Sequence, residues 1–136
     1  MLVQYEIKGG DFTAAGKASS EIKKILKQLN IEPVIIRRVA VALYEAEINV
    51  VAHAYNGIML ADIAPTGINV KVTDNGPGIA DIGKAMQEGF STASNEVRQM
   101  GFGAGMGLPN IKKNTDRMEL TSILGVGTTL NISVNF

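Results

Sequence analysis

The sequence predicts an α/β (α+β) two-layer fold in which helices pack on one face of a mixed, mostly antiparallel sheet. Hydrophobic periodicity gives the order strand, helix, helix, strand, strand, helix, loop, helix, strand, strand. This order departs from the strict alternation of a doubly wound nucleotide-binding fold. The 136 residues suit one domain spanning residues 1–136. Basic and acidic residues number 13 each, so the chain lacks the basic excess typical of proteins that bind nucleic acid.

Composition also excludes several kinds of site. The chain has no Cys and a single His, which excludes disulfides, thiolate metal sites, cysteine nucleophiles and an all-histidine zinc site. No apolar run approaches the roughly 18 residues that a membrane span requires. The N-terminal residues alternate in polarity and do not resemble a signal peptide. We therefore expect a soluble, cytoplasmic protein without membrane contacts.

The first third of the chain predicts one strand and two helices. Val3, Tyr5 and Ile7 alternate with polar residues, which is typical of a half-buried strand. Residues 13–29 form an amphipathic helical pattern. A second helix is predicted over residues 33–55, beginning at Pro33, a residue that suits the first helical position. This helix is apolar nearly all round and is therefore expected to be buried.

The rest of the chain alternates between strand and helix patterns. The predicted strands are residues 57–63, 67–74, 117–124 and 128–136. Helical spacing covers residues 79–86 and 107–114. Between these two segments, residues 88–106 show no period and are rich in Gly and Ser, which predicts a mobile loop. The inward face of the last strand is predicted to consist of Leu130, Ile132, Val134 and Phe136.

Asp74 is the first candidate functional residue. It continues the inward face of the apolar strand residues 68–72, so its carboxylate is expected to face the helices. A carboxylate in that position is costly unless something pairs with it. One alternative is a tight hairpin at Asn75 and Gly76. Residues 77–86 show no strand alternation, however, and we favour a carboxylate that faces a ligand.

The predicted helix 33–55 carries a polar stripe. Glu45 and Asn49 lie about 40° apart around the helix axis. His53 and Arg38 fall close to the same line, whereas Glu47 faces away. The apolar flanks favour a cleft over a solvated helix face. A carboxylate beside an amide can position a hydroxyl nucleophile and coordinate magnesium. For His53, a hydrogen-bonded position in the core or at its rim is favoured over a catalytic role.

Glycines cluster in short stretches. Residues 101–107 lead into a predicted helix, where converging backbone N–H groups would form an anion site; a flexible hinge is the alternative. Residues 125–127 by themselves predict only a hairpin loop. The signatures of phosphate-loop and dinucleotide-binding folds are both absent, because the glycine spacings are wrong.

Four motifs in order resemble the N, G1, G2 and G3 boxes of the GHKL ATPases, the family of gyrase, heat-shock protein 90, histidine kinases and the MutL proteins. The motifs are Glu45-x-x-x-Asn49, Asp74-x-Gly76-x-Gly78, Gly103-x-Gly105-x-Gly107-Leu108 and Gly125-x-Gly127-Thr128. The short chain and residues 81–92 are similar to small serine/threonine kinases that act as anti-sigma factors or stress-switch kinases.

The resemblance implies the Bergerat ATP-binding fold, with ATP and Mg²⁺ as cofactors and a mobile lid at about residues 88–106. Glu45 would be the general base, and Asn49 would hold Mg²⁺. Asp74 would form a hydrogen bond with the adenine amino group, and Thr128 would support the adenine end of the nucleotide. The glycines and the leucine that the resemblance places next to the nucleotide are Gly76, Gly78, Gly103, Gly105, Gly107 and Leu108. Arg98 or Lys112 is a further candidate for contact with the γ-phosphate.

By this resemblance the protein is an ATP-dependent serine/threonine kinase that phosphorylates a STAS-like antagonist. The alternative is a nucleotide-gated binding module that regulates a sigma factor or a phosphatase. A histidine-kinase catalytic domain is disfavoured, because the only His lies inside the predicted nucleotide helix. A homodimer through the edge of the first strand also fits the resemblance.

Overall fold

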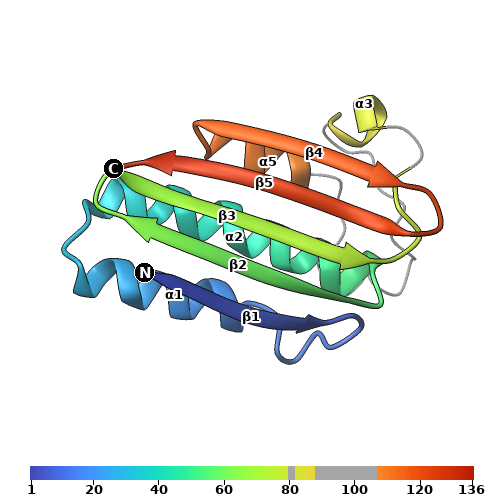
Figure 1. The fold of residues 1–136 in the computed structure, drawn as a ribbon, viewed down its shortest axis with the longest axis horizontal. Helices are drawn as coiled ribbons and strands as arrows, with labels where there is room; N and C mark the ends of the chain where they lie inside the picture. Colours follow the sequence, from blue (N-terminus) through green and yellow to red (C-terminus); the bar gives the residue numbers. More distant parts are fainter. Residues whose placement is uncertain (80–81, 88–106) are drawn as a thin grey trace.

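The computed structural model describes residues 1–79, 82–87 and 107–136 (Figure 1). The predicted lid at residues 88–106 lies outside them. The elements, in chain order, are β1 (Leu2–Lys8), α1 (Lys17–Gln28), α2 (Pro33–His53), β2 (Asn56–Ala64), β3 (Gly67–Asn75), α3 (Ile82–Ala85), α5 (Gly107–Lys113), β4 (Arg117–Ile123) and β5 (Gly127–Asn135).

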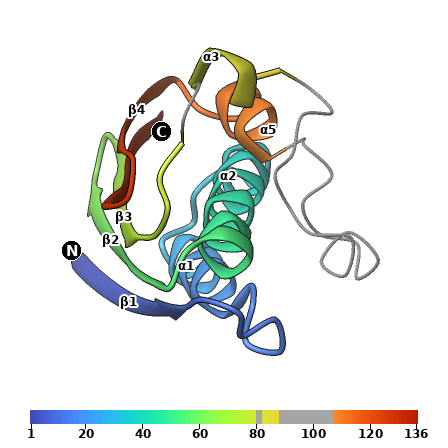
Figure 2. The same cartoon turned by 90° about the vertical axis from the view of Figure 1, so that its right-hand side faces the viewer.

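The strands form one sheet in the order β1-β2-β3-β5-β4. Every neighbouring pair in it is antiparallel. Figure 2 shows α1, α2 and α5 together on one side of the sheet. The predicted two-layer fold is thereby confirmed. Within the described ranges, no helix combines the length and the apolarity that crossing a membrane requires.

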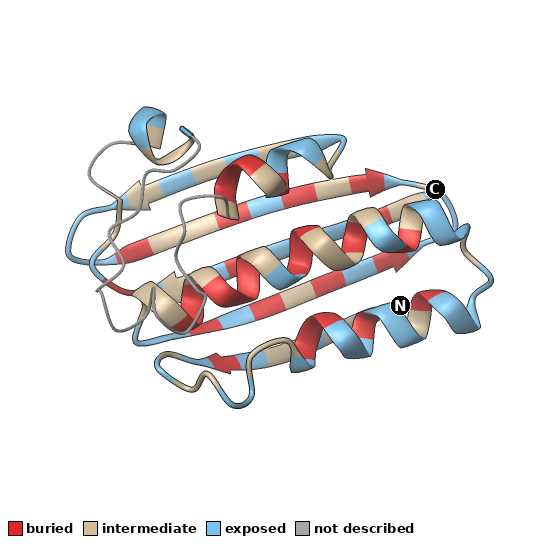
Figure 3. Cartoon of the chain, turned by 180° about the vertical axis from the view of Figure 1, so that it is seen from behind, coloured by how far each residue is buried: buried red, intermediate tan, exposed pale blue. Residues whose placement is uncertain are grey.

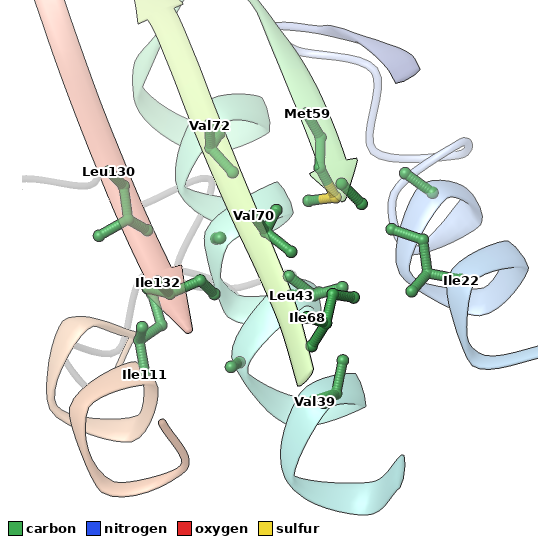
Figure 4. Close-up of a cluster of buried hydrophobic side chains, with 14 of the residues drawn as sticks. Ile22, Val39, Leu43, Met59, Ile68, Val70, Val72, Ile111, Leu130 and Ile132 are labelled. Atoms are coloured by element: carbon green, nitrogen blue, oxygen red, sulfur yellow. The ribbon is translucent and has the colours of Figure 1, made fainter. Parts of the chain in front are cut away.

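The two layers enclose the apolar core. Side chains alternate between buried and exposed along β2, β3 and β5, as a sheet with one covered face requires (Figure 3). The predicted inward residues Leu130, Ile132 and Val134 are buried. Figure 4 shows Ile132 of β5 beside Ile111 of α5, and Leu43 of α2 beside Ile68 of β3. The central helix α2 is therefore packed between the sheet and the other helices.

Two predicted helix ranges and one alternative were wrong. The first helix begins at Lys17 instead of residue 13, because Gly16 adopts a left-handed φ of 94° that no helix continues through. Of the helix predicted over residues 79–86, α3 covers Ile82–Ala85. The hairpin alternative at Asn75 and Gly76 is also wrong: β3 pairs with β2 and β5, and the Gly76 N–H donates to the Val126 carbonyl.

Both ends of the chain lie beside the β2–β3 turn. The Met1 amino group donates to the Ile63 carbonyl at 2.8 Å. The Phe136 N–H donates to the Thr66 carbonyl at 3.0 Å. Asp74 is near the opposite end of β3, paired with Gly57 and Thr128.

Candidate active site

The first residue of α5 lies against the polar stripe of α2. A Cβ atom added to Gly107 would lie 3.1 Å from Asn49 Oδ1 and 3.4 Å from Glu45 Oε2. Both α2 side chains are half-buried. Three residues that the sequence assigned to the general base, the metal ligand and the phosphate-binding segment are therefore neighbours, although about 60 positions of chain separate α2 from α5.

Asp74 occupies the inward face of the sheet, as predicted. Its Oδ1 accepts the Thr128 N–H at 3.2 Å. Its other cross-strand neighbour is Gly57, where a Cβ atom would come within 2.9 Å of Val50 Cγ1. Burial raises the pKa of the Asp74 carboxyl, and the hydrogen bond from Thr128 partly opposes this effect. The site thus holds a half-buried carboxylate with one oxygen bonded to β5.

The chain leaving β3 passes close to α2 and to the β4–β5 turn. A Cβ atom on Gly76 would lie 2.9 Å from Ala54 Cα, immediately after α2. Gly78 has a φ of 77°, and its Cβ atom would lie 2.6 Å from the Ile123 carbonyl oxygen. Only glycine fits this path without displacing backbone. Gly76 and Gly78 are therefore needed for close approaches between protein segments, and their predicted closeness to the nucleotide stays a prediction.

Helix α2 joins the two parts of the site. Glu45 and Asn49 contact the start of α5, and the end of α2 contacts Gly76. Nine residues separate Glu45 from Ala54, a rise of about 13 Å along the axis. One rigid helix therefore holds the carboxylate–amide pair at a fixed distance from the loop that follows Asp74.

Two residues near the site were not identified from the sequence. Ser122 Oγ accepts the Ile79 N–H at 2.7 Å and lies 2.9 Å from Thr128 Oγ1, so it ties the loop after Gly78 to β5. Gly57 lies opposite Asp74 at a tightly packed position, where a Cβ atom would come within 2.9 Å of Val50 Cγ1. The signal for Ser122 was a serine on the inward face of β4, after Met118 and Leu120.

Glu47 is a third residue whose role was not identified from the sequence. It faces away from the stripe, as expected, and it is only 3% exposed. Its carboxylate accepts backbone N–H groups at the start of α1, from Gly16 at 3.0 Å, Ala18 at 3.2 Å and Ser19 at 3.0 Å. These donors have no partner within α1, so Glu47 acts as an N-cap supplied by another helix.

The remaining predicted residues take varied positions. Leu108 has its side chain in the core. Lys112 is exposed in the last turn of α5. Arg38 pairs with Asp116 at 3.1 Å and so is held beside β4.

His53 is half-buried, and burial lowers its pKa, which favours the neutral ring. Gly103, Gly105 and Arg98 lie outside the described residues.

Replacing Asp74 by Asn separates ligand binding from stability. Because burial raises the pKa of Asp74 above its unfolded value of about 3.9, the stability contributed by this group is present at low pH and is lost as pH rises through the folded pKa. In the nucleotide-free protein we expect Asp74→Asn to be neutral near pH 3 and stabilising at pH 7, by up to about 1 kcal/mol for a half-exposed group. Thermal unfolding from pH 3 to 7 measures this.

The same substitution is expected to weaken ATP binding about 10- to 100-fold, because an amide N–H₂ would replace a charged acceptor. Asp62→Asn is the matched control, on the exposed face of β2. Equal ATP affinity of native protein and Asp74→Asn, measured by calorimetry, would remove Asp74 from the binding site.

Comparison with known proteins identifies the family. The profile described as the histidine kinase-like ATPase domain matches residues 11–134. The chain is 34% identical over 110 residues to the serine/threonine-protein kinase RsbT of Bacillus subtilis (strain 168), covering 78% of this chain and 77% of RsbT. It is 36% identical over 103 residues to the anti-sigma F factor of Caldanaerobacter subterraneus subsp. tengcongensis, covering 72% of this chain and 68% of that protein.

The anti-sigma F factor of Thermoanaerobacter sp. (strain X514) gives the same values of 36% identity over 103 residues, 72% of this chain and 68% of the relative. The range matched by the family profile, residues 11–134, includes all four motifs described above. The predicted resemblance to the GHKL family is confirmed. The chain belongs to the histidine kinase-like ATPase family, and within it to the type of the serine/threonine kinases and anti-sigma factors.

Proposed function

We propose that this ATP-dependent serine/threonine kinase transfers the γ-phosphoryl group of ATP to a Ser or Thr of a STAS-type antagonist protein. The observation that supports this most directly is the meeting of Glu45 and Asn49 with the start of α5 at Gly107. A base, an amide oxygen and the backbone of a helix start are the groups that phosphoryl transfer to a hydroxyl requires.

In this proposal Glu45 accepts the proton of the attacking hydroxyl. The carboxylate is half-buried and fixed on a long helix, so it can be aimed without a loop having to move. Asp74 orients the nucleotide by accepting a hydrogen bond at the far end, while Thr128 holds Asp74 Oδ1. Transfer is then mainly a matter of positioning.

The residues present also fit Mg²⁺. Within residues 1–79, 82–87 and 107–136, no group of three or more His, Cys, Asp or Glu side chains could hold a metal ion by itself. Mg²⁺ in phosphoryl-transfer sites is usually held by one or two protein oxygens together with substrate phosphates. The proposed protein ligand is Oδ1 of Asn49, which belongs to α2 and lies beside the start of α5. The ion would neutralise phosphate charge.

The decisive experiment uses labelled ATP, Mg²⁺ and purified STAS-domain proteins. Native protein, Glu45→Ala and Asp74→Asn are compared, and nucleotide binding is measured on each. Transfer to Ser or Thr by the native protein, lost in Glu45→Ala, is the expected result. ATP binding without transfer to any STAS protein would overturn the kinase proposal.

A second proposed function is nucleotide-gated binding of a sigma factor or a phosphatase, with little catalysis. The observation in its favour is the similarity to proteins named anti-sigma F factor. It predicts partner affinity that depends on nucleotide even in Glu45→Ala. Equal affinity with and without ATP would exclude it.

We also propose that the protein forms a homodimer through β1. β1 lies at one edge of the sheet, and among the described strands it pairs with β2 alone. An edge strand offers a row of backbone donors and acceptors to a second copy. Sedimentation of the native protein and of Gln4→Pro tests it, because the alternation of the antiparallel ladder turns the Gln4 N–H to the open edge and the Tyr5 N–H to β2. A native dimer that Gln4→Pro dissociates is the expected result.

Gly107→Ala tests the contact between α5 and α2. The new methyl group would lie 3.1 Å from Asn49 Oδ1, so the Asn49 side chain must shift, and it would touch Glu45 Oε2 at 3.4 Å. Stability should be unchanged or slightly higher, because Ala is the better helix former by about 0.5–1 kcal/mol. Phosphoryl transfer should fall about tenfold, because the proposed Mg²⁺ ligand Asn49 is displaced. Asn110→Ala in the same helix is the control, and a native transfer rate in Gly107→Ala would contradict the assignment.

A further inference from the structure

A groove separate from the Asp74 region runs between α1 and α2, the two helices that lie side by side in Figure 3. It has a volume of about 740 Å³ and is lined by both helices and by the loop that joins them. Glu45 is one of the residues that line the groove. The same carboxylate lies next to Gly107, so it belongs both to the groove and to the candidate active site.

The groove carries an excess of positive charge. Its lining includes Lys23, Lys27 and Arg37, and among the described residues its only carboxylate is Glu45, so these four side chains carry a net charge of +2. All three cations are exposed, and none of them forms an ion pair with another described residue. The whole chain has no net charge, so this excess is local. Unpaired cations along a groove attract acidic partners.

Between the cations the groove is apolar. Its lining includes Ile31, Ile36 and Val41, and Tyr44 is 40% exposed beside them. A groove between two helices with an apolar floor and charged rims suits an amphipathic helix, which would bury its apolar face and place acidic residues at the rims. Nucleic acid has no aliphatic face to offer such a floor.

We propose that the α1–α2 groove binds an acidic amphipathic helix of the phosphoacceptor protein and so delivers its Ser or Thr to Glu45. This inference rests on the proposed kinase function and names the docking surface for its protein substrate. Lys23, Lys27 and Arg37 supply the electrostatic selection, and the apolar floor supplies the buried contact.

The test pairs two double variants with equal charge change. Lys27→Glu combined with Arg37→Glu, the groove pair, reverses the sign of the net charge on the groove lining. Lys24→Glu with Lys71→Glu is the control, because these exposed residues lie on α1 outside the groove and on β3. For the STAS protein phosphorylated by the native enzyme, the groove pair should raise KM about tenfold and leave kcat and ATP affinity within about twofold. The control pair should change none of them.

A second measurement keeps the groove testable if no STAS protein is phosphorylated. A fluorescein-labelled amphipathic peptide of about 15 residues, with a leucine face flanked by Glu, is titrated by anisotropy. Its counterpart carries Lys in place of each Glu. The native protein should bind the acidic peptide about tenfold more tightly, and the groove pair should abolish that preference.

The outcomes separate the two proposals. Transfer with an unchanged KM in the groove pair overturns the docking surface and leaves the kinase standing. Absence of transfer with selective binding of the acidic peptide overturns the proposed transfer to a STAS protein and leaves the groove standing as a binding site for an acidic helix. If transfer is absent and neither peptide binds, or both bind equally, the docking surface is overturned as well.

Discussion

Replacing Glu45 by Gln is expected to lower the rate of phosphoryl transfer about 10²- to 10⁴-fold, the usual contribution of a general base. Gln is nearly isosteric, so packing against Gly107 and Asn49 is retained. It cannot accept the proton, because its amide is not basic. ATP affinity should stay the same or rise slightly, since a negative charge beside the triphosphate has been removed. Single-turnover transfer and calorimetric ATP binding measure the two effects separately.

The control for Glu45→Gln is Glu21→Gln, at an exposed position of α1. It should leave both quantities at native values. A native transfer rate in Glu45→Gln would mean that another group takes the proton. Parallel loss of ATP binding and transfer would instead assign Glu45 to nucleotide binding.

The second large effect is on stability. Glu47→Ala is expected to lower the free energy of unfolding by about 3 kcal/mol or more, because three N–H donors at the start of α1 lose their acceptor. For a chain of this length that corresponds to a fall in Tm of about 10 °C. Thermal unfolding followed by circular dichroism measures it.

Glu47→Gln should fall between the native protein and Glu47→Ala, because an amide oxygen can still accept while its nitrogen faces the N–H donors. Glu21→Ala is the control, since its side chain is exposed on the same helix that Glu47 caps. A Tm of Glu47→Ala within about 2 °C of native would show that water replaces the carboxylate at little cost.

Features set by local periodicity could be predicted from the sequence. The inward position of Asp74 follows from the alternation of residues 68–72, and the start of α2 follows from Pro33. The opening of α1 could not be predicted in this way. Its start depends on Glu47, about 30 residues further along the chain, which bonds the N–H of Gly16. Sequence spacing showed that Glu47 faces away from Glu45, but not what it faces.

The candidate site likewise has a part that could be predicted from the sequence and a part that could not. The four motifs could be recognised in order, and the structure brings Glu45, Asn49 and Gly107 together. The contribution of Ser122 depends on a contact between the loop at Ile79 and β5, and no local pattern encodes such a contact. Its one sequence signal, a hydroxyl on an otherwise apolar strand face, is too common to indicate a role by itself.

The position of both chain ends beside the β2–β3 turn has a practical consequence for labelling. Residue 67 and Asp74 are separated by about 23 Å of strand, so a dye, an affinity tag or a fused fluorescent protein joined to either end is attached at the far side of the sheet from the proposed adenine contact. The two ends are near enough to one another that a donor fluorophore on one and an acceptor on the other would report unfolding of the sheet. Such a sensor could follow denaturation while nucleotide is titrated into the same sample.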